Sequence, residues 1–243
     1  MAPDQEEDIW LLIIAHPDDE SMFFVPALRN ILCLDGEQLT PKIQILCLSN
    51  GDYRDVSDGP IRTNELCKAC SLLGIIEEKN CPPVAAEDEV SAVVVLDDKR
   101  MKDGPNEVWN SDLIADTIVK HIQKITQQQQ QQSISSKRRN VNIITFDQVG
   151  VSGHPNHVDV FRGIKHFVHE KCQVVLTDDE KKWMIRLKLK RPNTNGKVND
   201  VEEVGLRVLT LKSISNPLYK YFLWIFVELI PMILIWLISY TIY

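Results

Sequence analysis

Short apolar runs alternate with longer helical patterns along most of this chain. The runs predict strands and lie at residues 9–15, 42–48, 92–96 and 141–146, and the first is typical of a strand buried on both faces. Helical patterns follow them at residues 20–34, 60–73, 109–126 and 155–169. Strand alternating with helix predicts an α/β fold, a three-layer sandwich with a mostly parallel, Rossmann-like sheet. Sheets of this kind bind ligands at the carboxyl ends of their strands, near a switch in strand order.

Two polar segments interrupt this pattern. Six consecutive glutamines open a low-complexity segment at residues 127–139, which we expect to be a surface loop. A polar insertion at about residues 181–203 includes a predicted loop between two strand-like stretches, 183–190 and 206–211. Cys67 and Cys70 have CxxC spacing without a second such pair, so ordinary thiols are favoured over a redox or metal role.

The longest apolar run lies at residues 221–243. As a helix it would reach roughly 34 Å, which is enough for a hydrocarbon core of about 30 Å. Glu228 and Pro231 are unfavourable inside a membrane span, so an interfacial or re-entrant segment and a soluble core helix are the alternatives. We predict a folded domain over residues 1–218 and a hydrophobic membrane helix over residues 219–243.

Composition narrows the classes of protein. Hydrophobic residues make up 44% of the 243 and charged residues 25%, which fits a folded chain and excludes disordered, collagen-like and disulfide-scaffold classes. A formal net charge of −7 disfavours general binding to phosphate backbones, so no nucleic-acid partner is expected. The acidic N-terminus lacks the basic region of a secretory signal peptide.

Four polar side chains directly follow the first apolar run. His16, Asp18, Asp19 and Glu20 lie between this predicted strand and the helix after it. An acidic residue at a helix start can cap the helix and complement its dipole, which explains one carboxylate but not the group of four. These side chains are therefore candidates for chemistry at the carboxyl end of a strand.

A second polar group follows the fourth apolar run. His154 and His157 flank Pro155, a residue favoured in the first turn of a helix. One histidine and one aspartate from the first group, with one histidine from this group, would make three ligands and an open position, as at a catalytic zinc. A further carboxylate would act as a general base, and a further imidazole would stabilise an oxyanion or protonate a leaving amine. The alternative is two unrelated helix caps with core histidines.

Both groups carry a resemblance to a known family. Residues 15–20, Ala-His-Pro-Asp-Asp-Glu, resemble the signature of LmbE-like N-deacetylases. Residues 145–157, which run from Thr-Phe-Asp to His-Pro-Asn-His, resemble the branch of N-acetylglucosaminyl-phosphatidylinositol de-N-acetylases (PIG-L). Supporting matches include Asn50-Gly51, Arg62 and the stretch from Lys102 to Pro105. The likeness extends roughly from residue 9 to residue 221, apart from the polar insertions.

The resemblance implies specific roles for five of these residues. His16, Asp19 and His157 are the implied ligands of Zn²⁺, with Fe²⁺ as the alternative metal. Asp18 is the implied general base, which takes a proton from the attacking water. His154 is implied to stabilise the oxyanion and to help protonate the amine.

The resemblance also implies a substrate and a compartment. Arg62 matches a position implicated in holding substrate, and the alternative for it is a salt bridge to Glu65. The implied reaction removes acetyl from N-acetylglucosaminyl-phosphatidylinositol, the second step of GPI-anchor synthesis, on the cytosolic face of the endoplasmic reticulum membrane. The alternatives are deacetylation of a soluble N-acetylglucosaminide and a non-catalytic membrane scaffold on the same fold.

Overall fold

The computed structural model describes residues 7–34, 42–77, 91–132, 139–177, 182–190 and 201–212. The chain divides into two compact units, Met1–Leu211 and Lys212–Tyr243. The hydrophobic helix predicted over residues 219–243 lies outside the described residues. Within the described ranges, no helix combines the length and the apolar character that a membrane span requires.

The first unit contains seven strands and six helical segments among its described residues. In chain order they are β1 (Glu7–Ile14), η1 (Glu20–Phe24), α1 (Val25–Leu34), β2 (Lys42–Cys47), α2 (Asp58–Leu72), β3 (Val93–Val95), α3 (Ser111–Gln132), β4 (Arg139–Phe146), α4 (Gly150–Gly153), α5 (Pro155–Lys171), β5 (Cys172–Thr177), β6 (Lys182–Lys190) and β7 (Val201–Leu211).

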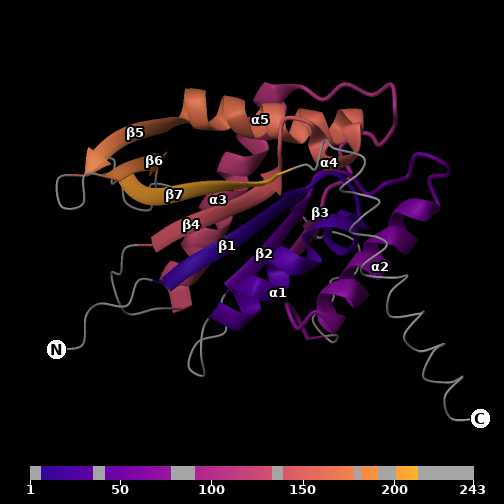
Figure 1. Cartoon of the computed structure of the whole chain (residues 1–243), viewed down its shortest axis with the longest axis horizontal. Helices are drawn as coiled ribbons and strands as arrows, with labels where there is room; N and C mark the ends of the chain where they lie inside the picture. The colour runs from indigo at the N-terminus through magenta and orange to yellow at the C-terminus, as the bar shows by residue number, and fades with distance from the viewer. Residues whose placement is uncertain are drawn as a thin grey trace, which may run out of the picture. The chain divides into compact units, whose positions relative to one another are not determined.

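All seven strands form one sheet in the order β3-β2-β1-β4-β7-β6-β5 (Figure 1). The five strands from β3 to β7 run parallel, and β6 and β5 extend the sheet through two antiparallel pairings, β7 with β6 and β6 with β5. The prediction of a mostly parallel sheet is confirmed. After β3 the chain returns to the other side of β1, so the strand order switches between β1 and β4, where such sheets bind ligands.

The central strand β1 is buried because helices cover both faces of the sheet. Figure 1 shows α1 in front of the sheet and α3 behind it. Every residue of β1 from Leu11 to Ile14 is at most 1% exposed, which explains its continuous apolar run. On the α3 side, α5 packs so closely that a Cβ on Gly163 would lie 2.4 Å from Ile114.

The sequence predicted that the glutamine run begins a surface loop, but in the structure the run is helical. Helix α3 continues through Gln132. Its buried face, which includes Ile118, Ile122 and Ile125, anchors the helix against the sheet. Glutamine has a good helix propensity and adds turns easily to a helix that is already formed.

The structure differs from the sequence expectations at three further points. β7 begins at Val201, inside the segment predicted as a loop, and β5 is an edge strand that the apolar pattern did not predict. Of the CxxC pair, Cys70 is a buried free thiol, whereas Cys67 is disulfide-bonded, so the prediction of ordinary thiols is wrong for Cys67.

Candidate active site

The two polar groups meet at the carboxyl edge of the sheet. β1 leads into His16, and β4 leads through α4 into His154 and His157. Because β1 and β4 are parallel neighbours, their ends share one edge. The imidazole centroids of His16 and His157 lie 5.3 Å apart, and that of His154 lies 4.9 Å from His16 and 5.1 Å from His157.

Asp19 connects the two groups. Its Oδ2 accepts hydrogen bonds from the backbone N–H groups of Ala15 (3.1 Å) and His16 (2.8 Å), which fix the carboxylate against the end of β1. Its Oδ1 lies 3.1 Å from Nε2 of His157. Asp19 is 2% exposed, so this carboxylate faces the imidazoles in a setting that excludes most water.

Contacts on the outer side of His157 determine which of its nitrogens is protonated. Nδ1 lies 3.1 Å from the carbonyl oxygen of Gly150, which can only accept, so Nδ1 carries the proton. The ring stacks on Phe146 at a centroid distance of 4.2 Å. Nε2 therefore presents its lone pair towards Asp19. Gly150 has φ +65°, and a Cβ there would lie 2.8 Å from the Cβ of His157.

His16 is held in a similar way from its outer side. Its Nε2 lies 3.0 Å from Oδ1 of Asp103 and 3.1 Å from Oδ1 of Asn156, both acceptors. Nε2 therefore carries the proton, and the lone pair of Nδ1 lies on the side of Asp19, with Oδ2 3.8 Å away. Burial lowers the pKa of His16, but the hydrogen bond to Asp103 and the charge of Asp19 outweigh burial, so the net shift is upward.

His154 differs from the other two histidines, because the ring nitrogen that the protein holds accepts a hydrogen bond instead of donating one. It is the N-cap of α5, and its Nδ1 accepts the backbone N–H of Asn156 at 3.3 Å. The proton of the neutral ring is therefore on Nε2, which makes that nitrogen a hydrogen-bond donor. Burial lowers the pKa of His154, and the neighbouring His16 and His157 lower it further, so the neutral form is favoured.

These residues fit a divalent metal ion. One ring nitrogen from each of His16, His154 and His157 lies within 4.8 Å of the other two. The carboxylate of Asp19 lies directly beside two of these rings. Imidazole and carboxylate donors suit zinc and other transition metals, and metal-binding histidines usually donate their second N–H to an acceptor, as His16 and His157 do here.

Asp18 lies at the open side of this cluster, in a strained backbone conformation. Its φ of 145° is unusual for a residue with a side chain. The backbone N–H of Asp18 donates to Oε2 of the buried Glu20 at 3.1 Å, and Nη2 of Arg62 donates to Oδ2 of Asp18 at 2.8 Å. Burial raises the pKa of Asp18, and Arg62 offsets that rise only in part.

Arg62 connects Asp18 to a carboxylate that the sequence did not indicate as a site residue, Asp103. Its Nη1 donates to the carbonyl of Gly51 at 2.6 Å and to Oδ2 of Asp103 at 3.3 Å. Its described partners do not include Glu65. Gly51 has φ +74°, and a Cβ there would lie 2.1 Å from Nη1 of Arg62. Asp103 is the third acidic residue after β3, following Asp97 and Asp98. Its place beyond the carboxyl end of a strand was the sequence signal that could have indicated a site residue.

A family model described as GlcNAc-PI de-N-acetylase (PIG-L) matches residues 11–168. The chain belongs to this family. The matched range contains every residue of the PIG-L site described above, from His16 to His157.

Three curated relatives are similar to this PIG-L family chain. A probable N-acetylglucosaminyl-phosphatidylinositol de-N-acetylase of Dictyostelium discoideum is 32% identical over 66% of this chain and 50% of its own length. The Bos taurus de-N-acetylase of the same name is 34% identical over 61% and 46%. The probable enzyme of Schizosaccharomyces pombe is 33% identical over 68% and 53%. The chain thus spans about half the length of the curated relatives that it matches.

Proposed function

We propose that this chain hydrolyses the N-acetyl group of N-acetylglucosaminyl-phosphatidylinositol to give glucosaminyl-phosphatidylinositol and acetate, the second step of GPI-anchor synthesis. The names of the relatives supply the substrate. The observation that carries the chemistry is the convergence of His16, Asp19 and His157 beside Asp18 and His154.

His16, Asp19 and His157 are the proposed ligands of a zinc ion, with iron as the alternative. Their contacts support this set over the three histidines, because Nε2 of His154 carries a proton and has no lone pair to offer, whereas Asp19 faces both of the other rings. The ion, when bound, supplies Lewis-acid polarisation of the acetamide carbonyl and of the attacking water.

Asp18 is the proposed general base. Its side chain is 48% exposed, so water reaches it, and its raised pKa brings its basicity closer to that needed for proton transfer. Asp18 takes a proton from the attacking water. Nε2 of His154 donates a hydrogen bond to the negative oxygen that develops. The proton that Asp18 took from the water then passes, with the help of His154, to the departing amine as the C–N bond breaks, which returns Asp18 to its ionised form.

Arg62 is the proposed substrate-binding residue. Its guanidinium is 24% exposed beside Asp18, and its fork of donors suits a phosphate or a sugar hydroxyl. Arg62 already contacts Asp18, Asp103 and the carbonyls of Pro17 and Gly51, so a substrate would compete for donors that orient the base.

The lipid substrate also motivates a proposed location. We place the chain at the endoplasmic reticulum membrane with its catalytic domain on the cytosolic face, attached through residues 219–243. This proposal rests on the apolar sequence of that segment and on the membrane-bound nature of the substrate.

Acetate release from the glycolipid tests the function and the division of roles together. Asp18→Asn should lower turnover by about a hundredfold or more, as expected for loss of a general base, and should retain the metal. Asp116→Asn, a surface carboxylate on α3 paired with Lys171, is the matched control and should keep both. Loss of metal in Asp18→Asn, or full activity, would contradict the roles. Wild-type activity on soluble N-acetylglucosaminides alone would favour the soluble-substrate alternative.

A further inference from the structure

Exposed apolar side chains gather around the site. Nine large hydrophobic residues are strongly exposed among the described residues, and six of them follow the carboxyl ends of β1, β2, β3 and β4. These six, which we call the apolar rim, are Met22, Tyr53, Val56, Ile61, Val108 and Val149. Val56 and Val108 are 76% and 79% exposed, so they contribute little to the core of the domain.

The rim is in direct contact with the catalytic loops. The backbone N–H of Met22 donates to the carbonyl of Asp18 at 2.9 Å. The ring of Tyr53 covers Gly104, where a Cβ would lie 3.3 Å from it. Gly104 in turn donates its N–H to Asn156, which contacts His16. Two members of the rim, Met22 and Tyr53, therefore lie beside the loops that hold the catalytic residues.

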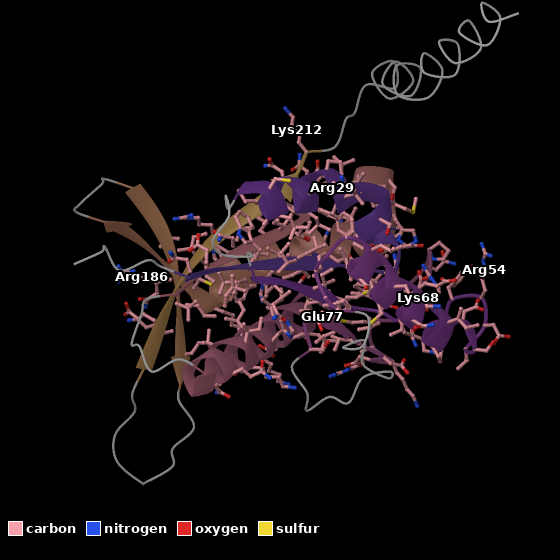
Figure 2. All side chains as sticks on the ribbon, turned by 90° about the horizontal axis from the view of Figure 1, so that it is seen from below. Arg29, Arg54, Lys68, Glu77, Arg186 and Lys212 are labelled. Atoms are coloured by element: carbon pink, nitrogen blue, oxygen red, sulfur yellow. The ribbon has the colours of Figure 1, made fainter. Side chains whose placement is uncertain are left out.

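The end of β7 gives a second, independent indication. Leu211, its last residue, pairs with Phe146, the last residue of β4, so the described chain leaves the sheet at the catalytic edge. Figure 2 shows Lys212 at this exit. The apolar run begins at Tyr221, and the nine residues from 212 to 220 can reach at most about 30 Å. The apolar run therefore follows, in sequence, the end of β7 that lies at the catalytic edge.

The charge around the rim indicates the kind of surface that fits it. Residues 51–61 contain three aspartates, Asp52, Asp55 and Asp58, and a single basic residue, Arg54, which points outward (Figure 2). This net charge of −2 does not favour anionic lipids. Insertion of apolar side chains among neutral headgroups does not require positive charge.

We propose that the apolar rim inserts into the headgroup region of a neutral phospholipid bilayer and holds the catalytic cluster over a lipid-linked substrate. This proposal rests on the proposed deacetylation. The rim gives the domain its own membrane contact, with the active-site mouth facing the lipid surface. The sugar of a membrane-embedded glycolipid is then presented to Asp18 and His154 without leaving the bilayer.

A pair of double variants of the full chain tests the rim. Val56→Ser with Val108→Ser changes the two most exposed side chains of the rim, neither of which is a proposed catalytic residue. Leu72→Ser with Val174→Ser is the matched control, because these residues are also exposed but lie on the last turn of α2 and on the edge strand β5. Leu72 is roughly 20 Å along α2 from Asp58, at the end away from the site.

Two substrates separate docking from chemistry. On phosphatidylcholine vesicles that carry the glycolipid, the rim variant should lose roughly tenfold in turnover per inserted side chain. On the water-soluble N-acetylglucosaminyl-inositol-phosphate headgroup it should stay within about twofold of wild type. The control should match wild type on both. Equal losses for rim and control on vesicles, or equal losses for the rim variant on both substrates, would overturn the proposal.

Hydrogen exchange with substrate-free vesicles keeps the docking proposal separate from the proposed function. Phosphatidylcholine vesicles should slow exchange in the wild-type peptides that cover residues 51–61 and 105–110, and high salt should not reverse the effect. The protection should disappear in the rim variant. Protection absent from wild type refutes membrane docking even if the enzyme is active, whereas protection without any acetate release refutes only the deacetylation.

Discussion

Replacing Asp103 with alanine should weaken metal binding without unfolding the domain. The carboxylate of Asp103 accepts from Nε2 of His16 at 3.0 Å, on the side of the ring away from Asp19. This contact fixes the ring orientation and keeps the lone pair of Nδ1 available to the ion. Without it, the ring can rotate or change tautomer, and the site must be organised again on each binding event.

The structure also sets the size of the effect. Loss of an acceptor behind a metal-binding histidine typically lowers metal affinity by about 10- to 100-fold, which is about 1.4 to 2.7 kcal/mol. Oδ1 of Asn156 remains 3.1 Å from Nε2 of His16, so a second, uncharged acceptor survives. We therefore expect a loss near tenfold for Asp103→Ala, and a smaller loss for Asp103→Asn, which keeps an oxygen.

Competition for Zn²⁺ between the apoprotein and a chelator measures this loss directly. Asp116→Ala, which removes a surface carboxylate of α3 that pairs with Lys171, is the control and should bind as wild type does. Thermal unfolding of each apoprotein shows whether the domain is intact. A folded Asp103→Ala variant with a metal affinity within about twofold of wild type would show that Asn156 alone orients His16. That result would contradict the role given to Asp103.

Two further predictions concern pH. Burial raises the pKa of Asp18 and Arg62 lowers it, so Arg62→Met should raise that pKa. The acid limb of the pH–rate profile should then move to higher pH. An unmoved limb would mean that Asp18 is not the base. Burial lowers the pKa of His121 from 6.5 to about 4. As the pH falls, the unfolded chain therefore binds this proton before the folded chain does. The free energy of unfolding should fall by about 3 kcal/mol between pH 6.5 and pH 4. His121→Leu should flatten that fall in denaturant titrations at several pH values; identical curves would exclude His121 as its source.

Local pattern was sufficient for the buried strands at the centre of the sheet, but not for β5 or for the start of β7. The apolar runs at β1, β2 and β4 match strands covered on both faces, because burial on both sides favours apolar side chains at most positions of the run. Gln44, Asn142 and Thr145 are polar exceptions. The boundary of α3 was not predictable in this way. Its last turns consist of glutamines, and their helical state depends on the buried isoleucines before them and not on any apolar periodicity of their own.

By itself, the sequence determined that two polar groups follow buried strands, and their residue types indicated a metal and a base. Only the tertiary structure decided which partners they have. Strand order places β1 beside β4, and this brings His16 to His157. Asp103 reaches His16 across 87 residues of sequence, and Arg62 pairs with Asp18 and Asp103, not with Glu65 on its own helix. Periodicity reports which face of an element is buried, whereas contacts between loops depend on how the strands are ordered.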